Sequence, residues 1–362
     1  MKLSIYLADQ NPHRDKTLGV TAMTDALLRE LVDRDSFCIE TFGSKSSYHL
    51  DDSRINVRLF PWSTDRTLFR VLMDNLHPLF CRSNSDAWLY PKGYLPFCFR
   101  SASPCVGIVH DTILLWYYDH YRDTRSSLEY MYWLTLLRRS VARFDLILTV
   151  SESAKKQILD LCERFSICPP PIKVTYESVR YACEKEVCSK QNYVVHLASN
   201  LPHKKTDWLL EIWAHAINSR RELPLLKLVG RVPDSSMPLV QKHPQIERLP
   251  FLDEGAYKQL LGQARALILP SEIEGFGLPA VEAYCLGTPV CYVKGTAVDE
   301  VLSIPNHTGA FELSDRDSLF IALEEVLDIS PESVASARIR LQDLYSAKSF
   351  GESVAACLSQ LN

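Results

Sequence analysis

The sequence lacks any apolar run close to the ~20 residues that a membrane-spanning helix needs, and it contains no repeats or low-complexity tracts. We therefore expect no transmembrane helix and no repeat architecture. Met1 and Lys2 lead directly into an apolar stretch at 3–8, and Asp9 follows too soon for the hydrophobic part of a secretory signal. These features predict a cytoplasmic protein.

An excess of charge of either sign is also lacking. The chain has 40 basic and 44 acidic residues, a net charge of −4, which argues against a general nucleic-acid-binding protein. The 11 cysteines are scattered, and Cys183 and Cys188, the nearest approach to a zinc pair, have no second pair or nearby His. We expect a reducing compartment and no metal site.

An alternation of apolar and amphipathic segments runs through the 362 residues, which are enough for two domains. The patterns predict strands at 3–8, 37–41, 56–60, 86–90, 105–109, 145–150, 193–198, 225–229, 266–269 and 290–293. They predict helices at 21–33, 126–143, 207–216, 256–264, 315–327, 333–345 and 350–361, with Ser151 as the N-cap of another. Such alternation is typical of an α/β fold with parallel sheets covered on both faces. The prolines at 169–171 interrupt the series.

The segment 270–290 is the most informative part of the chain. Gly275 and Gly277 follow an apolar strand and allow a ligand to approach the backbone closely. Pro279 suits the first turn of a helix, which Gly287 and Pro289 end. The positive end of this short helix faces the glycine loop and favours an anion such as a phosphate.

Two carboxylates flank this anion site, Glu274 in the loop and Glu282 about one turn into the helix. A phosphate would repel them, so they need another role, and accepting hydrogen bonds from sugar hydroxyls is the natural one. The alternative is an ordinary βα loop with two surface glutamates.

The motif Pro-Ser-x-x-Glu-Gly-Phe-Gly-Leu-Pro-x-x-Glu-Ala, with seven residues between Glu274 and Glu282, resembles the signature of retaining sugar-nucleotide glycosyltransferases of family 4. The resemblance implies the GT-B fold, two Rossmann-like domains with parallel sheets facing across a cleft. It implies an acceptor-side domain at 1–170, a connection at 171–190, a nucleotide-sugar-binding domain at 191–345 and a terminal helix at 346–362 that crosses back to the first domain.

The same resemblance assigns the donor-binding residues of the second domain. It implies that Glu274 contacts the sugar hydroxyls and Glu282 the ribose of the nucleotide. The backbone amides that face the sugar and the diphosphate would belong to Gly275, Phe276, Gly277 and Leu278.

Cations near the leaving diphosphate are needed as its charge develops. No Asp-x-Asp motif lies in a suitable loop, so we expect a metal-independent enzyme that uses side chains instead. The segment 199–206 resembles the family's Pro-Arg-Lys-Asn element, with Lys205 as the phosphate-binding lysine and Lys204 in place of the arginine. A second arginine that the family often has is missing near Ser199, and Lys204 or Arg231 would have to substitute for it. The alternative is two solvated lysines at a helix start.

In the first domain, His110 and Asp111 end an apolar strand, where ligands bind in open α/β sheets. They resemble the family's His-Asp element, in which His110 would hydrogen-bond the donor sugar or carry partial charge near the anomeric centre. The departing phosphate, rather than His110, would then deprotonate the acceptor. The alternative is a structural histidine.

Four further residues lie in weaker motifs. Gly19 lies in the first predicted βα loop, which lacks the Gly-x-Gly-x-x-Gly dinucleotide fingerprint. Gly19 resembles the family's glycine that approaches the donor phosphate. The alternative is a simple glycine at a helix start. Gly230 and Arg231 end a strand and border the nucleobase in this interpretation, and Glu300 resembles a further donor-binding glutamate.

The segment 116–143 is rich in Tyr, Trp and Arg. Such a composition suits a peripheral contact with a membrane or a lipid-linked acceptor. The alternative is an aromatic core patch with solvated arginines.

The sequence therefore predicts a retaining, metal-independent hexosyltransferase with no cofactor. Its donor would be a nucleotide diphosphate sugar, with GDP-mannose favoured over UDP-glucose or a UDP-N-acetylhexosamine. Its acceptor would be a hydroxyl of a glycan or lipid-linked glycan, as in lipopolysaccharide or O-antigen biosynthesis at the inner face of the membrane. The alternatives are a sugar-nucleotide epimerase of the same fold and a non-catalytic sugar-binding relative.

Overall fold

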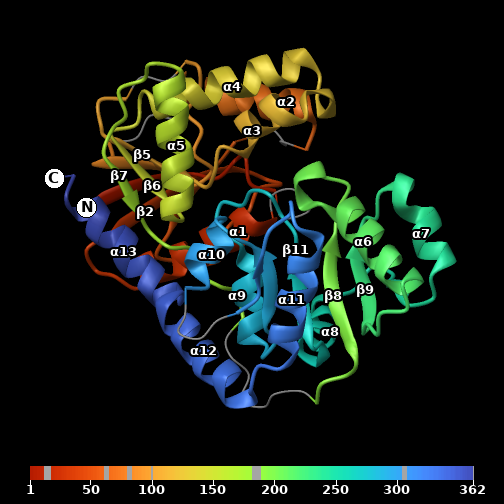
Figure 1. The fold of residues 1–362 in the computed structure, drawn as a ribbon. Coiled ribbons are helices and arrows are strands. Elements are labelled where there is room, and N and C mark those ends of the chain that lie inside the picture. The colour runs from red at the N-terminus through yellow and green to blue at the C-terminus, as the bar shows by residue number, and fades with distance from the viewer. Residues whose placement is uncertain are drawn as a thin grey trace. The chain divides into compact units, whose positions relative to one another are not determined.

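The computed structural model describes residues 1–11, 18–60, 65–79, 84–98, 101–181, 189–303 and 308–361. They form two compact units, one of Met1–Ser178 with Tyr345–Asn362 and the other of Val179–Leu344 (Figure 1). Among the described residues, no helix is both long enough and apolar enough to cross a bilayer.

The first unit is built on a parallel sheet of seven strands in the order β3-β2-β1-β4-β5-β6-β7. The strands are β1 (Lys2–Tyr6), β2 (Cys38–Ser44), β3 (Asn56–Phe60), β4 (Ala87–Tyr90), β5 (Cys105–Val109), β6 (Leu146–Thr149) and β7 (Ile172–Val174). The helices of this unit are α1 (Leu18–Val32), α2 (Thr67–Leu76), α3 (Ile113–His120), α4 (Ser127–Val141), α5 (Glu152–Arg164) and α13 (Ala347–Ser359).

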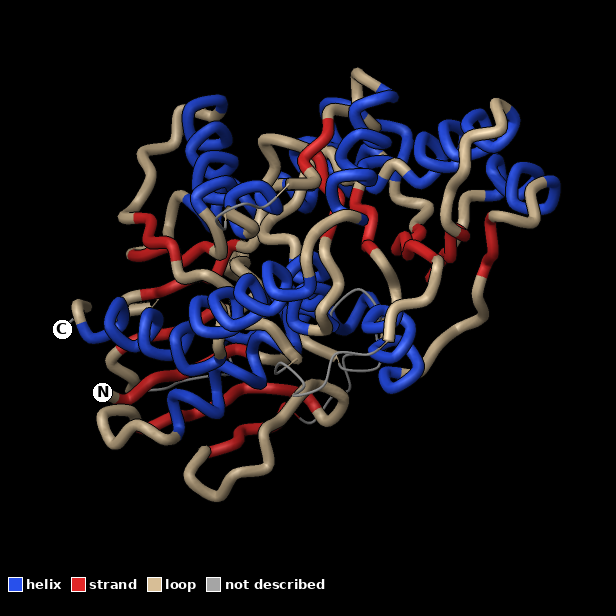
Figure 2. The backbone as a smooth tube through the Cα atoms, turned by 60° about the horizontal axis from the view of Figure 1, so that its bottom comes forward, coloured by secondary structure: helices blue, strands red, loops and turns tan. Residues whose placement is uncertain are grey.

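The second unit repeats this plan with six parallel strands in the order β10-β9-β8-β11-β12-β13. Figure 2 shows the strands in red and the helices in blue. Its strands are β8 (Tyr193–Ala198), β9 (Leu225–Gly230), β10 (Ile246–Arg248), β11 (Ala266–Leu269), β12 (Val290–Val293) and β13 (Ala310–Phe311). Its helices are α6 (Thr206–Asn218), α7 (Met237–Lys242), α8 (Glu254–Gln263), α9 (Leu278–Cys285), α10 (Ala297–Val301), α11 (Arg316–Leu327) and α12 (Pro331–Leu344).

The central strands of both sheets are apolar because helices cover both faces. Every residue of β5 and β11 is buried, as the uninterrupted apolar runs predict. Ser151 caps α5 as predicted, since its Oγ accepts a hydrogen bond of 2.9 Å from the Ala154 amide.

The chain returns to the first unit at Tyr345, and α13 packs against α1. Phe350, Val354 and Leu358, spaced four residues apart, form the buried face of α13. A Cβ on Gly351 would lie 2.4 Å from the Cβ of Glu30, so a glycine is what allows the two helices to approach this closely.

Several elements were not predicted. Strand β7 lies within the segment expected to be a connection, because three residues are too short for a periodic pattern. The helices α2 and α3 were also missed. Gly19 is in the first turn of α1, not in a loop, since the helix begins at Leu18. The interpretation of Gly19 as a loop glycine was therefore wrong.

Candidate functional site

Two loops meet at the centre of the second sheet. Strands β8 and β11 are hydrogen-bonded neighbours, and the chain leaves them towards opposite edges of the sheet. The carboxyl ends of such a strand pair form a crevice, which is where ligands bind in open α/β sheets. The loop after β8 contains Lys204 and Lys205, and the loop after β11 contains Glu272 and Glu274. The predicted second-domain site thus lies at the switch point of this sheet.

The loop after β11 has the predicted glycine-dependent shape. Gly277 is the N-cap of α9 with a φ of 93°, a conformation that favours glycine. A Cβ on Gly277 would also lie 2.6 Å from Val298 Cγ2. Phe276 is buried, so its side chain anchors the loop and only its backbone can face a ligand. The short helix beginning beside Pro279 is confirmed.

Glu274 is paired with Lys204 across the two loops. Lys204 Nζ donates a hydrogen bond of 2.5 Å to Glu274 Oε1, and the side chain of Glu274 is 12% exposed. Burial raises the pKa of Glu274, but Lys204 and a hydrogen bond from Ser271 outweigh it and hold the pKa below its usual range. Glu274 is therefore an ionised, preoriented acceptor.

Lys205 differs from Lys204 in its backbone conformation and in the carboxylate that it contacts. Its backbone is left-handed, with a φ of 50°, and it forms the N-cap of α6. Its Nζ lies 2.8 Å from Oε1 of Glu272. Both lysines thus tie the loop after β8 to the loop after β11, and the alternative of two simply solvated lysines is wrong.

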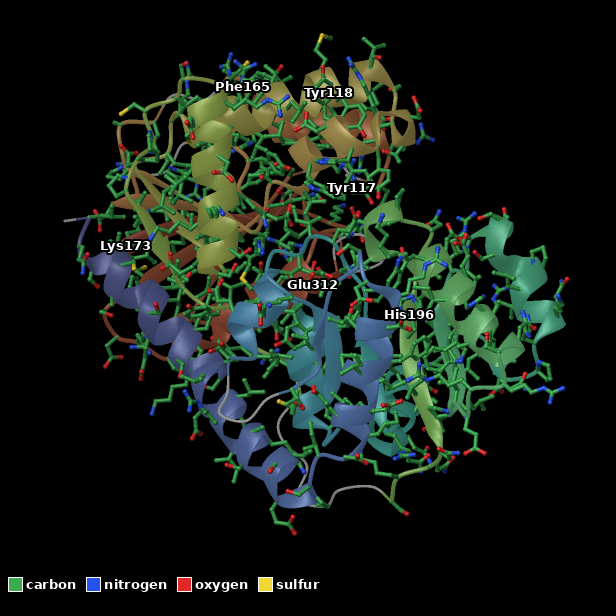
Figure 3. All side chains as sticks on the ribbon, in the orientation of Figure 1. Tyr117, Tyr118, Phe165, Lys173, His196 and Glu312 are labelled. Atoms are coloured by element: carbon green, nitrogen blue, oxygen red, sulfur yellow. The ribbon has the colours of Figure 1, made fainter. Side chains whose placement is uncertain are left out.

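A buried histidine supports these loops from below. His196 on β8 (Figure 3) donates from Nδ1 to the Ile268 carbonyl at 3.0 Å, and its Nε2 lies 2.9 Å from the hydroxyl of Thr206. That hydroxyl accepts a hydrogen bond of 3.0 Å from the Ser199 amide. Burial lowers the pKa of His196 to about 4, so the ring is neutral. Its two hydrogen bonds connect β8 to β11 and to the start of α6.

Glu282 on α9 is paired with an arginine that the sequence did not suggest. Arg180 Nε donates to Glu282 Oε1 at 2.8 Å, and Arg180 Nη2 donates to Oε2 at 3.3 Å. Glu282 is only 1% exposed. The two residues are 102 positions apart, and Arg180 lies in the predicted connection without a motif, so no local pattern signals the contact.

The weaker candidates lie at other strand ends of the second unit. Gly230 ends β9 with a φ of 111°, and a Cβ there would lie 2.4 Å from the Ala198 carbonyl oxygen, which requires glycine. Arg231 follows on the surface. Glu300 is half-buried on α10, whereas its neighbour Asp299 accepts bonds from Tyr292 and Gly295. The predicted donor-binding roles of these residues stay predictions.

In the first unit, His110 and Asp111 follow β5 and line a pocket of about 140 Å³ together with Lys92 and Tyr94. His110 Nε2 donates to the Pro91 carbonyl at 2.9 Å, and burial lowers the pKa of His110. A neutral ring with its proton on Nε2 leaves Nδ1 as an acceptor for a hydroxyl. Asp111 Oδ1 accepts from the Ile113 amide at 2.9 Å, at the start of α3.

The aromatic segment at 116–143 packs largely into the first unit. Tyr117 (labelled in Figure 3) and Tyr130 are buried in its core. The Tyr118 ring meets the Tyr130 ring edge-on. Arg122 lies over the Tyr118 ring at 4.5 Å, and Arg138 lies over Phe165 at 4.0 Å. These contacts agree with the core-patch alternative for the rings.

Metal ligands are not gathered in the described part of the chain, where no group of three or more His, Cys, Asp or Glu side chains is arranged to hold an ion. Cys183 and Cys188 lie outside the described residues. Metal independence stays a prediction.

Comparison with known proteins finds similarity to glycosyltransferases. Residues 191–328 match the family described as Glycosyl transferases group 1. The chain is 30% identical over 204 residues to the O-antigen chain mannosyltransferase RfbU of Salmonella typhimurium LT2, an alignment that covers 54% of this chain and 53% of that protein. It is 26% identical over 270 residues to O-antigen chain mannosyltransferase B of Escherichia coli, covering 68% of this chain and 67% of the relative. The chain thus spans about half the length of the first relative.

The similarity to solved structures extends over the whole chain. Sucrose-phosphate synthase from Thermosynechococcus elongatus superposes with a TM-score of 0.72 at 13% identity, covering 100% of this chain and 99% of that one. At this identity the likeness concerns the fold alone. The predicted GT-B fold class and the predicted family resemblance are both confirmed.

Proposed function

From a GT-B fold whose second unit matches the group 1 glycosyl transferases, we propose that this protein is a retaining glycosyltransferase that uses a nucleotide diphosphate sugar. The observation that carries this proposal is the pairing of Lys204 with Glu274 on two loops at the switch point of the second sheet. This pair brings a cation for a phosphate and an ionised acceptor for sugar hydroxyls to one place.

In this proposal the second unit binds the donor. The amides at the start of α9 and the ammonium group of Lys204 hold the diphosphate, while Glu274 and Glu282 accept hydrogen bonds from the sugar and the ribose. The bond between the anomeric carbon and the phosphate oxygen breaks, and a bond from that carbon to the acceptor oxygen forms on the same face. The acceptor proton passes to the departing phosphate.

The first unit binds the acceptor in this proposal. The pocket beside His110 contains carboxylate, ammonium and aromatic groups, the set that commonly lines sites for sugar hydroxyls and sugar rings. Neutral His110 then accepts a hydrogen bond from a sugar hydroxyl at Nδ1. Because the ring is neutral, we favour this role over that of a charged group near the anomeric centre.

We favour GDP-mannose as the donor because two of the relatives that the chain resembles are O-antigen chain mannosyltransferases. The acceptor would be a hydroxyl of a glycan or lipid-linked glycan in surface-polysaccharide assembly, at the cytoplasmic face of a membrane. A peripheral contact with that membrane suits helices α2 and α4, which Asn75 and Tyr132 join by a hydrogen bond of 2.8 Å. They expose apolar side chains at Leu68, Phe69, Leu72, Leu128 and Met131.

The test is incubation of the purified protein with GDP-mannose or UDP-glucose and an acceptor extract of lipid-linked glycan, with product analysis by mass spectrometry. Transfer with retained anomeric configuration supports the proposal. Conversion of the donor to an isomer without transfer would support the epimerase alternative, and binding without any reaction would support a non-catalytic protein.

A further inference from the structure

A second cavity of the second unit lies at the amino ends of its central strands. Its volume is about 310 Å³, within the range of about 300–1,000 Å³ that is usual for small-molecule sites. Arg265, directly before β11, and Pro289, directly before β12, both line it. Because the strands of this sheet are all parallel, the cavity lies at the edge opposite to the carboxyl ends, where the candidate donor site is. The two sites are therefore distinct.

The wall of this cavity is mainly aliphatic. Helix α11, the turn that follows it and helix α12 contribute the side chains of Val326, Leu327, Ile329 and Val334. Val326 and Val334 are themselves buried. A free sugar or a sugar phosphate would leave many of its hydroxyls without partners against such a wall, which disfavours it as a ligand. An aliphatic chain would lose only its contact with water.

Two cations line the same cavity, and none of its ten described lining residues carries a carboxylate. Lys190 Nζ is held at the wall by a hydrogen bond of 2.8 Å to the Thr288 hydroxyl. The side chain of Arg265 donates to Asn192 Oδ1 at 3.3 Å and to the Leu327 carbonyl at 3.5 Å. These long bonds use two of the five N–H groups of a guanidinium. The positive charge at the wall favours an anionic group on the ligand and disfavours a cationic one.

We propose that this cavity binds an aliphatic carboxylate of medium chain length. Its chain lies against α11 and α12, and its carboxylate lies beside Arg265 and Lys190. This site goes beyond the proposed transfer reaction and does not depend on it.

The experiment is titration calorimetry of the full chain with octanoate, and in parallel with hexanoate, acetate and octan-1-ol. Octanoate should bind at one site, and its affinity should exceed that of hexanoate by about fourfold for each added methylene. Acetate lacks the chain and should not bind detectably. Octan-1-ol lacks the charge and should bind at least several-fold more weakly than octanoate.

Two variants with matched controls locate the site. Ala335 lines the cavity from α12, so Ala335→Trp should fill it and abolish octanoate binding. Ser336→Trp adds the same side chain at the next, exposed position of α12, outside the lining, and should bind octanoate normally. Arg265→Gln should weaken octanoate binding about tenfold and octan-1-ol binding less than about twofold. Arg221→Gln removes an arginine elsewhere in the same unit and should change neither.

Two further variants keep the test decisive. Lys190→Gln removes the second cation and should lower the preference for octanoate over octan-1-ol if Arg265→Gln folds poorly. Leu68→Glu with Leu72→Glu changes exposed apolar residues of the first unit and should leave octanoate binding intact. Loss of binding in that double variant, normal binding by Ala335→Trp, or equal affinities for octanoate and octan-1-ol would overturn the inference. Failure of octanoate to bind the wild type would also overturn it, and each of these results would leave the proposed function intact.

Discussion

Lys204 and Glu274 lie 70 positions apart in the chain, and their Nζ and Oε1 atoms are 2.5 Å apart in the folded second unit. The pair connects the loops that follow two neighbouring strands, β8 and β11. A charged pair that is mostly buried holds both partners in position before a ligand arrives. The anion-binding and hydroxyl-binding groups of the candidate site are therefore preorganised by one another.

Removing the carboxylate at this pair should mainly affect turnover. Glu274→Ala deletes a charged acceptor for sugar hydroxyls, and such bonds contribute roughly 1.5–3 kcal/mol each. We expect the transfer rate to fall well over tenfold, measured as product formed from labelled GDP-mannose. Glu324→Ala removes an equally paired but exposed carboxylate and serves as the control. A Glu274→Ala enzyme with near-normal rates would contradict the assigned role.

The two adjacent lysines should not be equivalent. Lys204 is joined to Glu274, whereas Lys205 is joined to the neighbouring Glu272 and caps α6 with a left-handed backbone. Lys204→Gln should weaken GDP binding about tenfold. Lys205→Gly, which suits that backbone, should weaken it less. Calorimetry measures both changes, and the reverse order would support Lys205 as the phosphate-binding lysine.

The stability of the first unit should depend on pH through Asp74. Tyr6 donates a hydrogen bond of 2.9 Å to Asp74, and burial together with the charge of Asp9 raises the pKa of Asp74 to about 7, against the opposing charges of Lys92 and Arg70. The folded protein then binds a proton that the unfolded chain releases between about pH 4 and 7. The free energy of unfolding should fall as the pH rises through this range.

Asp74→Asn removes that proton uptake and should flatten the decline by about 3 kcal/mol, measured by urea unfolding at pH 4.5 and 7.5. Asp52→Asn is the control with the opposite sign, because hydrogen bonds from Arg54 lower the pKa of Asp52 to about 2. Stability from that acid is lost only below about pH 4. Equal slopes for the wild type and Asp74→Asn would rule out a titrating Asp74.

Helices α2 and α4 should mediate any binding to lipid. Leu68 and Leu72 are 69% and 44% exposed on α2. The double change Leu68→Glu with Leu72→Glu should reduce co-sedimentation with vesicles of anionic phospholipid at least several-fold, since it removes apolar area and adds like charge. Ile339→Glu on α12 changes an equally exposed apolar residue of the second unit and should have no effect. Equal co-sedimentation of the two variants with the vesicles would argue against lipid binding by helices α2 and α4.

Most of the local structure was predictable because it depends on local signals. The strands at Cys105–Val109, Tyr193–Ala198, Ala266–Leu269 and Val290–Val293 match their predicted bounds, since an apolar run bordered by polar residues marks a buried strand. The strand at Asn56–Phe60 also matches, although its first four residues are exposed. The loop at Gly277 and the helix that follows it were also correct. Gly19 was misplaced because a helix start has no unique position within a polar stretch.

The sequence did not predict which residues pair with one another at the site. Lys204 and Lys205 were recognised as cations of the site, but their separate pairing with Glu274 and Glu272 was not. Arg180 was missed altogether, because nothing in its neighbourhood distinguishes it from an ordinary surface arginine.

The amino-acid sequence by itself determined the alternating strands and helices, the glycine turn before α9 and the chemical types present in the two loops, since these follow from periodicity, backbone freedom and side-chain chemistry within a few residues. Only the tertiary structure decided which cation meets which carboxylate. Those contacts join segments 70 and 102 positions apart, and the order of the parallel strands, rather than any local pattern, brings these segments together.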